Sequence, residues 1–288
     1  MSAPPDRPAA RAGRACAAAA VGWSNLIARV RARALAWGAG GRPGAFAEVI
    51  GLLLWILLFA RLQSAAGKDI TAAAGNALAL QSMERAMHID IEWSANHWLA
   101  GHLVLSHLAV YFYRLYYAAI AGVLVWVFTR HADAYRKVRR VLVAMMALIL
   151  PVYWAVPASP PRFALPGVTD IVARYDILGH ASQDTGNGQN HYSAMPSLHA
   201  MPSLHVGWSL WCAYALWSVL RAGHPRLALL PWMFPLLMAA DVLANGNHYV
   251  LDVAGSIVLL AASVVAASMW GRLAERRCQA RPRRSVDT

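Results

Sequence analysis

The sequence predicts an all-α integral membrane protein, a bundle of six transmembrane helices. Of its 288 residues, 58% are hydrophobic and only 14% are charged, and this apolar share exceeds that of ordinary soluble domains. The apolar residues gather in long runs, and a helix needs about 20 of them to cross ~30 Å of hydrocarbon. Because the basic residues lie between these runs, the net charge of +12 indicates membrane topology and excludes a nucleic-acid surface.

Six candidate spans follow one another along the chain. They are Ala45–Leu62, Leu103–Phe128, Val141–Val156, Ser203–Leu220, Leu227–Leu243 and Tyr249–Trp270. The spans divide the chain into three parts. These are an Ala/Arg-rich tail over residues 1–44, a six-helix membrane domain over 45–270 and a basic tail over 271–288.

The distribution of basic residues predicts how the bundle is oriented. Of the 26 Lys and Arg residues, 20 fall in segments on the same side as the N-terminus. Such a bias marks the cytosolic side, so we expect both termini in the cytosol and the protein in the plasma (inner) membrane. The longer connections, 63–101 and 158–194, then lie outside. In the first, Leu80, Met83 and Met87 recur at helical spacing, which fits either an amphipathic helix on the membrane surface or a helix packed over the bundle.

Three polar clusters stand at span ends, all on the predicted outer side. The first is ASPPRF, where Arg162 follows two prolines and offers a planar fork that suits phosphate oxygens. The last is NGNHYVLDVAG, where His248 and Asp252 are four residues apart. On a helix this spacing places both on one face. The carboxylate can then hold one imidazole nitrogen and leave the other free as a nucleophile or base.

The middle cluster is a duplication, AMPSLH at Ala194–His199 and again at Ala200–His205. In each copy the Pro suits a helix start, where free N–H groups attract an anion and the Ser adds a hydroxyl. A His stands three residues after each Pro, within reach of an oxyanion held there.

Only one of the two copies can form the start of the helix. A helix that began at Pro196 would carry Pro202 in its third turn, which costs about 3 kcal/mol. We therefore expect the helix to begin at Pro202 and the working pair to be Ser203 and His205. The alternative pair, in the first copy, is Ser197 and His199.

The segments PPR, AMPSLHVGW and GNHYVLD resemble, in this order, the three signature motifs of the type-2 phosphatidic acid phosphatase superfamily. They are most similar to the branch related to inositol phosphorylceramide synthase, an inositolphosphotransferase. The resemblance covers about Val141 to Leu260. It implies a metal-independent membrane phosphatase or phosphotransferase, without a cofactor, that acts on a phospholipid or another lipid phosphate at the outer leaflet.

The resemblance also implies roles for individual residues. His248 would attack phosphorus and form a phosphohistidine, with Asp252 orienting it. A histidine of the PSLH element, His205 or His199, would protonate the departing alkoxide. Arg162 and the neighbouring Ser203 or Ser197 would hold phosphate oxygens.

Two cations of the wider family pattern are missing, a Lys upstream of Arg162 and an Arg shortly before His248. Arg114 is a candidate replacement because it lies about 16 Å inside the second predicted span at 1.5 Å per residue. A buried Arg needs an anionic partner, which can be a recessed phosphate or an acid such as Asp241.

A non-catalytic membrane protein, either a transporter or an inactive relative, is the alternative hypothesis. It is motivated by the duplicated hexad, which disturbs a site that would demand close geometry. A transporter is expected to show an internal repeat of spans, and the sequence contains no convincing one.

Overall fold

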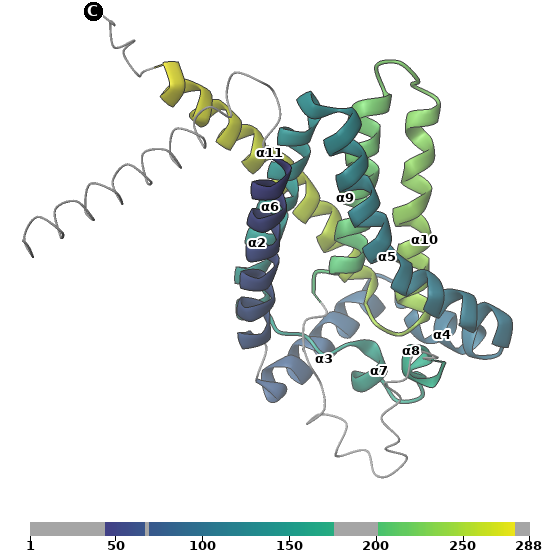
Figure 1. Ribbon diagram of the computed structural model, residues 1–288. Coiled ribbons are helices and arrows are strands. Elements are labelled where there is room, and N and C mark those ends of the chain that lie inside the picture. Colours follow the sequence, from purple (N-terminus) through teal and green to yellow (C-terminus); the bar gives the residue numbers. More distant parts are fainter. Residues whose placement is uncertain (1–43, 67–68, 176–200, 280–288) are drawn as a thin grey trace, which may run out of the picture. The chain divides into compact units, whose positions relative to one another are not determined.

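The computed structural model describes residues 44–66, 69–175 and 201–279, and these residues form helices and connections without a strand. The chain divides into two compact units, residues 1–54 and 55–288. Of the first unit, the described residues are 44–54, which contain the first half of α2 (Ala45–Ala65). The second unit contains the rest of α2 and all the other helices described below (Figure 1).

Five described segments are long and apolar enough to cross a membrane, and a sixth apolar helix, α9 (Leu204–Leu220), is shorter at 17 residues. The five are α2, α5 (Leu103–Arg130), α6 (Ala132–Ala155), η2 (Leu227–Trp232) continued by α10 (Met233–Ala244), and α11 (Val250–Gln279). The predicted all-α membrane fold is confirmed. The predicted three-part division of the chain and the side of each terminus remain predictions.

The short helix α9 is surrounded by longer helices of the second unit. It contacts α5, α6, α10 and α11. An apolar helix surrounded in this way has no polar face to present. Accordingly, Trp211 is fully buried and its indole N–H donates to the carbonyl of Val138 on α6, at 3.0 Å. Packing against protein on several sides therefore explains why this segment is apolar all round.

The connection after α2 forms two helices, α3 (Ile70–Ala86) and α4 (Glu92–Ala100). Leu80 is buried in a small core that also contains Tyr249, whereas Met83 and Met87 are half exposed. Glu84, on the same helix, is fully buried. Of the two alternatives for this segment, the structure thus shows the helix packed on the second unit, with Leu80 and Glu84 facing inward.

The connection after α6 is fixed by Asn96 of α4. The Asn96 amide donates to the carbonyls of Thr169 and Ala244, both at 2.9 Å, and its oxygen accepts the N–H of Thr169 at 2.7 Å. These bonds join α4, the connection and the end of α10. Two one-turn helices lie in this connection, α7 (Pro161–Ala164) and α8 (Ile171–Arg174).

Candidate active site

The start of α11 brings His248 and Asp252 into contact. Nδ1 of His248 lies 3.3 Å from Oδ2 of Asp252, and the same oxygen accepts the N–H of Tyr249 at 2.8 Å. The helix begins only at Val250, so His248 stands just before it and not on a helical face as predicted. The contact forms because Asp252, in the first turn, reaches back over the helix start in the manner of a capping box.

The turn that carries His248 also depends on Gly246. After α10 ends, the carbonyl of Val242 accepts the N–H groups of Asn247 and His248, at 3.0 and 3.3 Å. Gly246 has φ of +69°, a conformation that side-chain-bearing residues rarely adopt. Its carbonyl accepts the N–H of Arg162 at 2.9 Å, so this turn also fixes the backbone of α7.

Two buried carboxylates that the sequence analysis did not single out hold the next residues of α11. Oε1 of Glu92 accepts the N–H of Val250 at 2.9 Å, and Oε1 of Glu84 accepts the N–H of Leu251 at 2.7 Å. Both side chains are almost completely buried. Burial, reinforced by Glu92, raises the pKa of Glu84 to about 8, and burial also raises the pKa of Tyr249.

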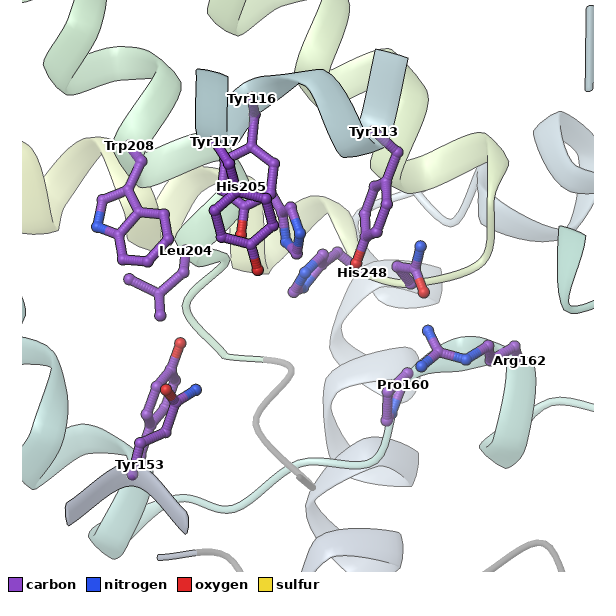
Figure 2. Close-up of a pocket in the computed structure, with 12 residues that line it drawn as sticks. Tyr113, Tyr116, Tyr117, Tyr153, Pro160, Arg162, Leu204, His205, Trp208 and His248 are labelled. Carbon is purple, nitrogen blue, oxygen red and sulfur yellow. The ribbon is translucent and has the colours of Figure 1, made fainter. Parts of the chain in front are cut away.

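A cavity of about 230 Å³ opens beside His248. Its lining brings together residues that lie far apart in the sequence, from α2, α5, α6, α7, α9 and the turn before α11 (Figure 2). The lining residues are Gln63, Tyr113, Tyr116, Tyr117, Tyr153, Pro160, Arg162, Leu204, His205, Trp208, Asn247 and His248.

His205 projects from the first turn of α9 into this cavity. Its ring centroid lies 6.0 Å from that of His248. The rings of Tyr113 and Tyr116, on α5, lie at 4.2 and 4.5 Å from His205. Figure 2 shows these tyrosines reaching down from α5 toward the two histidines. The two imidazoles therefore face the same cavity, and the tyrosine rings hold the ring of His205 in place.

Arg162 is the one cation among the cavity-lining residues that the structure describes. Its guanidinium pairs with Asp170, at 3.1 Å from Nε to Oδ2, and Figure 2 shows it pointing toward His248. The buried amide nitrogen of Asn247 lines the same space and has no partner among the described residues. The cavity thus combines one positive charge with neutral donors, which suits an anion of low charge.

Two expectations about the duplicated hexad differ from this arrangement, and a third falls on residues that the structure does not describe. Helix α9 begins at Leu204, two residues after the predicted start at Pro202, because Ser203 caps it. The Ser203 hydroxyl accepts the N–H of Val206 at 3.4 Å, and Ser203 does not line the cavity. The first copy of the hexad, with Ser197 and His199, lies outside the described residues.

Arg114 does not line the cavity, and its side chain is exposed. The cavity-facing residues of α5 are Tyr113, Tyr116 and Tyr117, which have the i, i+3, i+4 spacing of one helical face. Arg114 is one position from Tyr113 and is therefore turned by about 100° around the helix. The described lining of the cavity thus does not include Arg114, and its predicted role in holding phosphate has no support from this arrangement.

The sequence contains little that would identify Glu84, Glu92 or the tyrosines of α5 as residues at the site. Glu84 and Glu92 have no motif around them, although two acids at the predicted membrane surface are worth notice. The tyrosines of α5 stand in the sequence YFYRLYY, where the charged Arg114 is the more conspicuous candidate for a phosphate ligand.

Comparisons with known proteins add one finding. The family model described as PAP2 superfamily matches residues 78–266, a range that contains every cavity-lining residue except Gln63. Neither the search of curated proteins nor that of solved structures gave a match.

Proposed function

The chain belongs to the PAP2 superfamily, and from this premise we propose that it transfers or cleaves the phospho head group of a membrane lipid through a phosphohistidine. Membership supports a phosphatase or phosphotransferase activity in general. The observation that carries the proposal is the contact of His248 with Asp252, opposite His205, in a cavity that also contains Arg162.

The first half of the reaction follows from the order of these groups. The N–H of Nδ1 of His248 donates a hydrogen bond to Asp252 and stays on the ring, so that Nε2 carries the lone pair that acts as nucleophile. Nε2 attacks phosphorus, and the bond from phosphorus to the leaving oxygen breaks. His205 donates its proton to this oxygen. Arg162 and the Asn247 amide offset the charge on the non-bridging oxygens.

The second half reverses the roles. His205, now neutral, takes a proton from water or from an acceptor alcohol, whose oxygen attacks phosphorus. The bond from Nε2 of His248 to phosphorus breaks, and the imidazole is regenerated. Water gives hydrolysis and an alcohol gives transfer, so the acceptor alone distinguishes the two outcomes.

The charge of the cavity favours a phosphodiester donor. A phosphomonoester carries close to two negative charges at neutral pH, whereas a diester carries one. The described lining residues supply one cation, Arg162, together with tyrosine hydroxyls and the amides of Gln63 and Asn247. This balance supports a head-group transferase of the inositolphosphotransferase-like kind that acts on a phospholipid.

The side of the reaction rests on the distribution of Lys and Arg. The bias of 20 among 26 basic residues supports, under the positive-inside rule, a catalytic cavity at the outer leaflet of the plasma (inner) membrane. The partners of the protein in this proposal are the membrane and a phospholipid donor.

The test compares His248→Ala, His205→Ala and a matched control, His224→Ala, whose side chain is exposed at the far end of α9. Purified full-length protein in detergent is incubated with head-group-labelled lipids, with and without candidate alcohols. Labelled phosphohistidine is sought by mass spectrometry. We expect His248→Ala to lose both label and turnover, and His205→Ala to lose about 10²–10⁴-fold in turnover.

The control His224→Ala should behave like the wild type. A folded His248→Ala that turned over lipid at the wild-type rate would refute the mechanism. Equal turnover of phosphatidic acid, a monoester, and of a diester donor would refute the preference for a diester.

A further inference from the structure

We propose that Glu84 and Glu92 are positioning residues that hold the start of α11, and through it His248 and Asp252, in the geometry that attack on phosphorus requires. This inference rests on the proposed function for its catalytic part. Neither residue touches the reacting atoms, since neither lines the catalytic cavity.

The acceptors of the hydrogen bonds at this helix start come from distant parts of the chain. The first N–H groups of a helix have no partner within it. Here the N–H groups of Val250 and Leu251 are accepted by Glu92 and Glu84, residues 158 and 167 positions away. The position of the first turn is therefore set by α3 and α4. His248 directly precedes this turn, so a shift of the turn moves the imidazole.

Carboxyl groups crowd the same place. Three carboxyl groups, those of Glu84, Glu92 and Asp252, gather around the start of α11 together with the Tyr249 phenol. Two arginines of neighbouring elements pair with other acids. Arg85, on α3, is exposed and pairs with Asp90 at 3.7 Å, and Arg162, on α7, pairs with Asp170.

The surroundings of Glu84 favour its protonated form. Its Oε1 accepts the N–H of Leu251, while its buried Oε2 has no partner among the described residues. Burial first, and then the neighbouring Glu92 and Asp252, raise its pKa to about 8. A proton on Oε2 removes the negative charge of Glu84 from this crowded place, while Oε1 continues to accept the N–H of Leu251.

The sign of the pH effect follows from this raised pKa. Between the ordinary carboxyl value of 4.5 and about 8, the folded protein binds a proton that the unfolded chain releases. Stability therefore falls as pH rises through this window. Above the raised pKa of about 8, Glu84 is ionised and its buried charge is unfavourable beside the other acidic groups at the start of α11.

The test uses Glu84→Gln, Glu84→Ala and the control Arg85→Ala in the purified full-length protein. Gln keeps an oxygen acceptor for Leu251 but cannot ionise, so the thermal midpoint of Glu84→Gln should vary less between pH 6 and 9 than that of the wild type. Arg85→Ala should follow the wild type. Glu84→Ala loses the acceptor, and its kcat should fall by about 10- to 100-fold with little change in KM.

Two results would overturn the inference. One is a Glu84→Gln protein whose thermal midpoint depends on pH as in the wild type. The other is a Glu84→Ala protein with wild-type kcat. If Glu84→Ala does not fold, the Glu84→Gln series still decides. The thermal series needs no substrate, so it gives an answer even if the proposed lipid chemistry fails.

A second cavity, far from the first, carries an independent inference. It encloses about 480 Å³ between the beginning of α6 and the C-terminal part of α11. Its charged lining residues are Asp133, Arg136, Lys137, Arg140, Arg272 and Glu275, and we call it the basic pocket.

The basic pocket has an excess of positive charge that the described residues do not neutralise. In the described part of the chain, no carboxylate lies within ion-pair distance of its four cations. Two of the cations instead lie near aromatic rings, Lys137 at 6.0 Å from Tyr214 and Arg140 at 5.9 Å from Trp270. Such a concave surface attracts an anion.

The position of the basic pocket indicates which anion. Gly271, in its lining, lies about 30 Å along α11 from Val250 at 1.5 Å per residue, which is the thickness of the hydrocarbon core. The pocket and the catalytic cavity therefore belong to opposite headgroup layers. Met269, Trp270 and Leu273 beside it are 58%, 47% and 52% exposed and can contact acyl chains. We infer that the basic pocket binds the headgroup of an anionic phospholipid.

The test removes three charges from the pocket and, as a control, three from outside it. The pocket variant is Arg136→Ala/Lys137→Ala/Arg272→Ala, and the control is Arg130→Ala/Arg221→Ala/Arg226→Ala. Purified full-length protein in neutral detergent is titrated with phosphatidylglycerol, phosphatidylcholine or inorganic phosphate. Bound lipid is counted by native mass spectrometry, and folding is checked by circular dichroism.

We expect phosphatidylglycerol to bind the wild type and the control, and the pocket variant to bind it at least about tenfold more weakly, because each Lys or Arg near an anionic surface contributes about 1 kcal/mol. Equal binding by both variants would overturn the inference. So would equal binding of phosphatidylcholine, or saturation by inorganic phosphate that blocks the lipid.

Discussion

At the level of single residues, the cavity beside His248 has one guanidinium, that of Arg162, among its described lining residues. Arg162 is placed by three contacts, since its N–H donates to the carbonyl of Gly246, its Nε lies 3.1 Å from Asp170, and its guanidinium lies over the ring of Phe163 at 4.6 Å. These contacts leave little freedom to the side chain. Its planar fork is therefore presented to the cavity in one orientation.

We predict that Arg162→Lys lowers kcat/KM for a lipid donor by about 10- to 100-fold, because Lys keeps the charge but loses the second parallel hydrogen bond to phosphate. The matched control is Arg174→Lys, on α8, outside the cavity. The measurement is head-group release by purified protein. An equal loss in both variants would mean that Arg162 acts only through the structure of the connection.

At the level of elements, the turn between α10 and α11 connects the parts of the site. Gly246 adopts φ of +69°, and a Cβ atom added there would lie 2.6 Å from Cγ1 of Val168. The same residue accepts the N–H of Arg162. A side chain at this position therefore disturbs both the turn that carries His248 and the packing of the connection that carries Arg162.

We predict that Gly246→Ala destabilises the protein by about 1–2 kcal/mol from the left-handed conformation alone, with a further loss from the clash. Adding Val168→Ala should relieve the clash and recover part of the loss. The control Gly75→Ala, in the middle of α3, meets nothing within 4 Å and should be neutral or stabilising. Thermal unfolding in detergent measures all three, and a Gly246→Ala protein as stable as the wild type would contradict the prediction.

At the level of the whole molecule, the orientation in the membrane decides which lipids the site can meet. Residues on the cavity side of the bundle, such as Asp90 between α3 and α4, are predicted to face outward. Residues at the other end, such as Gly223 after α9, are predicted to face the cytosol. The charge bias alone supports this assignment.

We predict that a membrane-impermeant maleimide labels Asp90→Cys but not Gly223→Cys in intact cells, and that both react after the membrane is broken. The native thiols should stay silent from outside, because Cys212 is buried and Cys16 and Cys278 lie in the predicted cytosolic tails. The opposite labelling pattern would move the proposed chemistry to the inner leaflet.

Much of the fold could be predicted because membrane spans are local features. Twenty apolar residues identify a span wherever it packs, so each predicted span overlaps an apolar helix. The ends agree less well, since α6 begins at Ala132, before the predicted Val141, and α11 continues past the predicted Trp270. The start of α9 was missed by two residues, since the choice between Pro202 and Ser203 depends on whether the Ser203 hydroxyl caps the helix. Such a cap is decided by local geometry that the spacing of residues does not contain.

The sequence by itself determined the helical membrane architecture and the candidate groups at the span ends, because hydrophobicity and motif spacing are properties of neighbouring residues. Only the tertiary structure decided which of these groups share a cavity. It places Arg162, His205 and His248 together and turns Arg114 away. It also brings Glu84 to the N–H of Leu251 across 167 positions. The reason is physical: rotation of a helix about its axis and contacts between distant segments are set by packing of the whole bundle, not by any short stretch of chain.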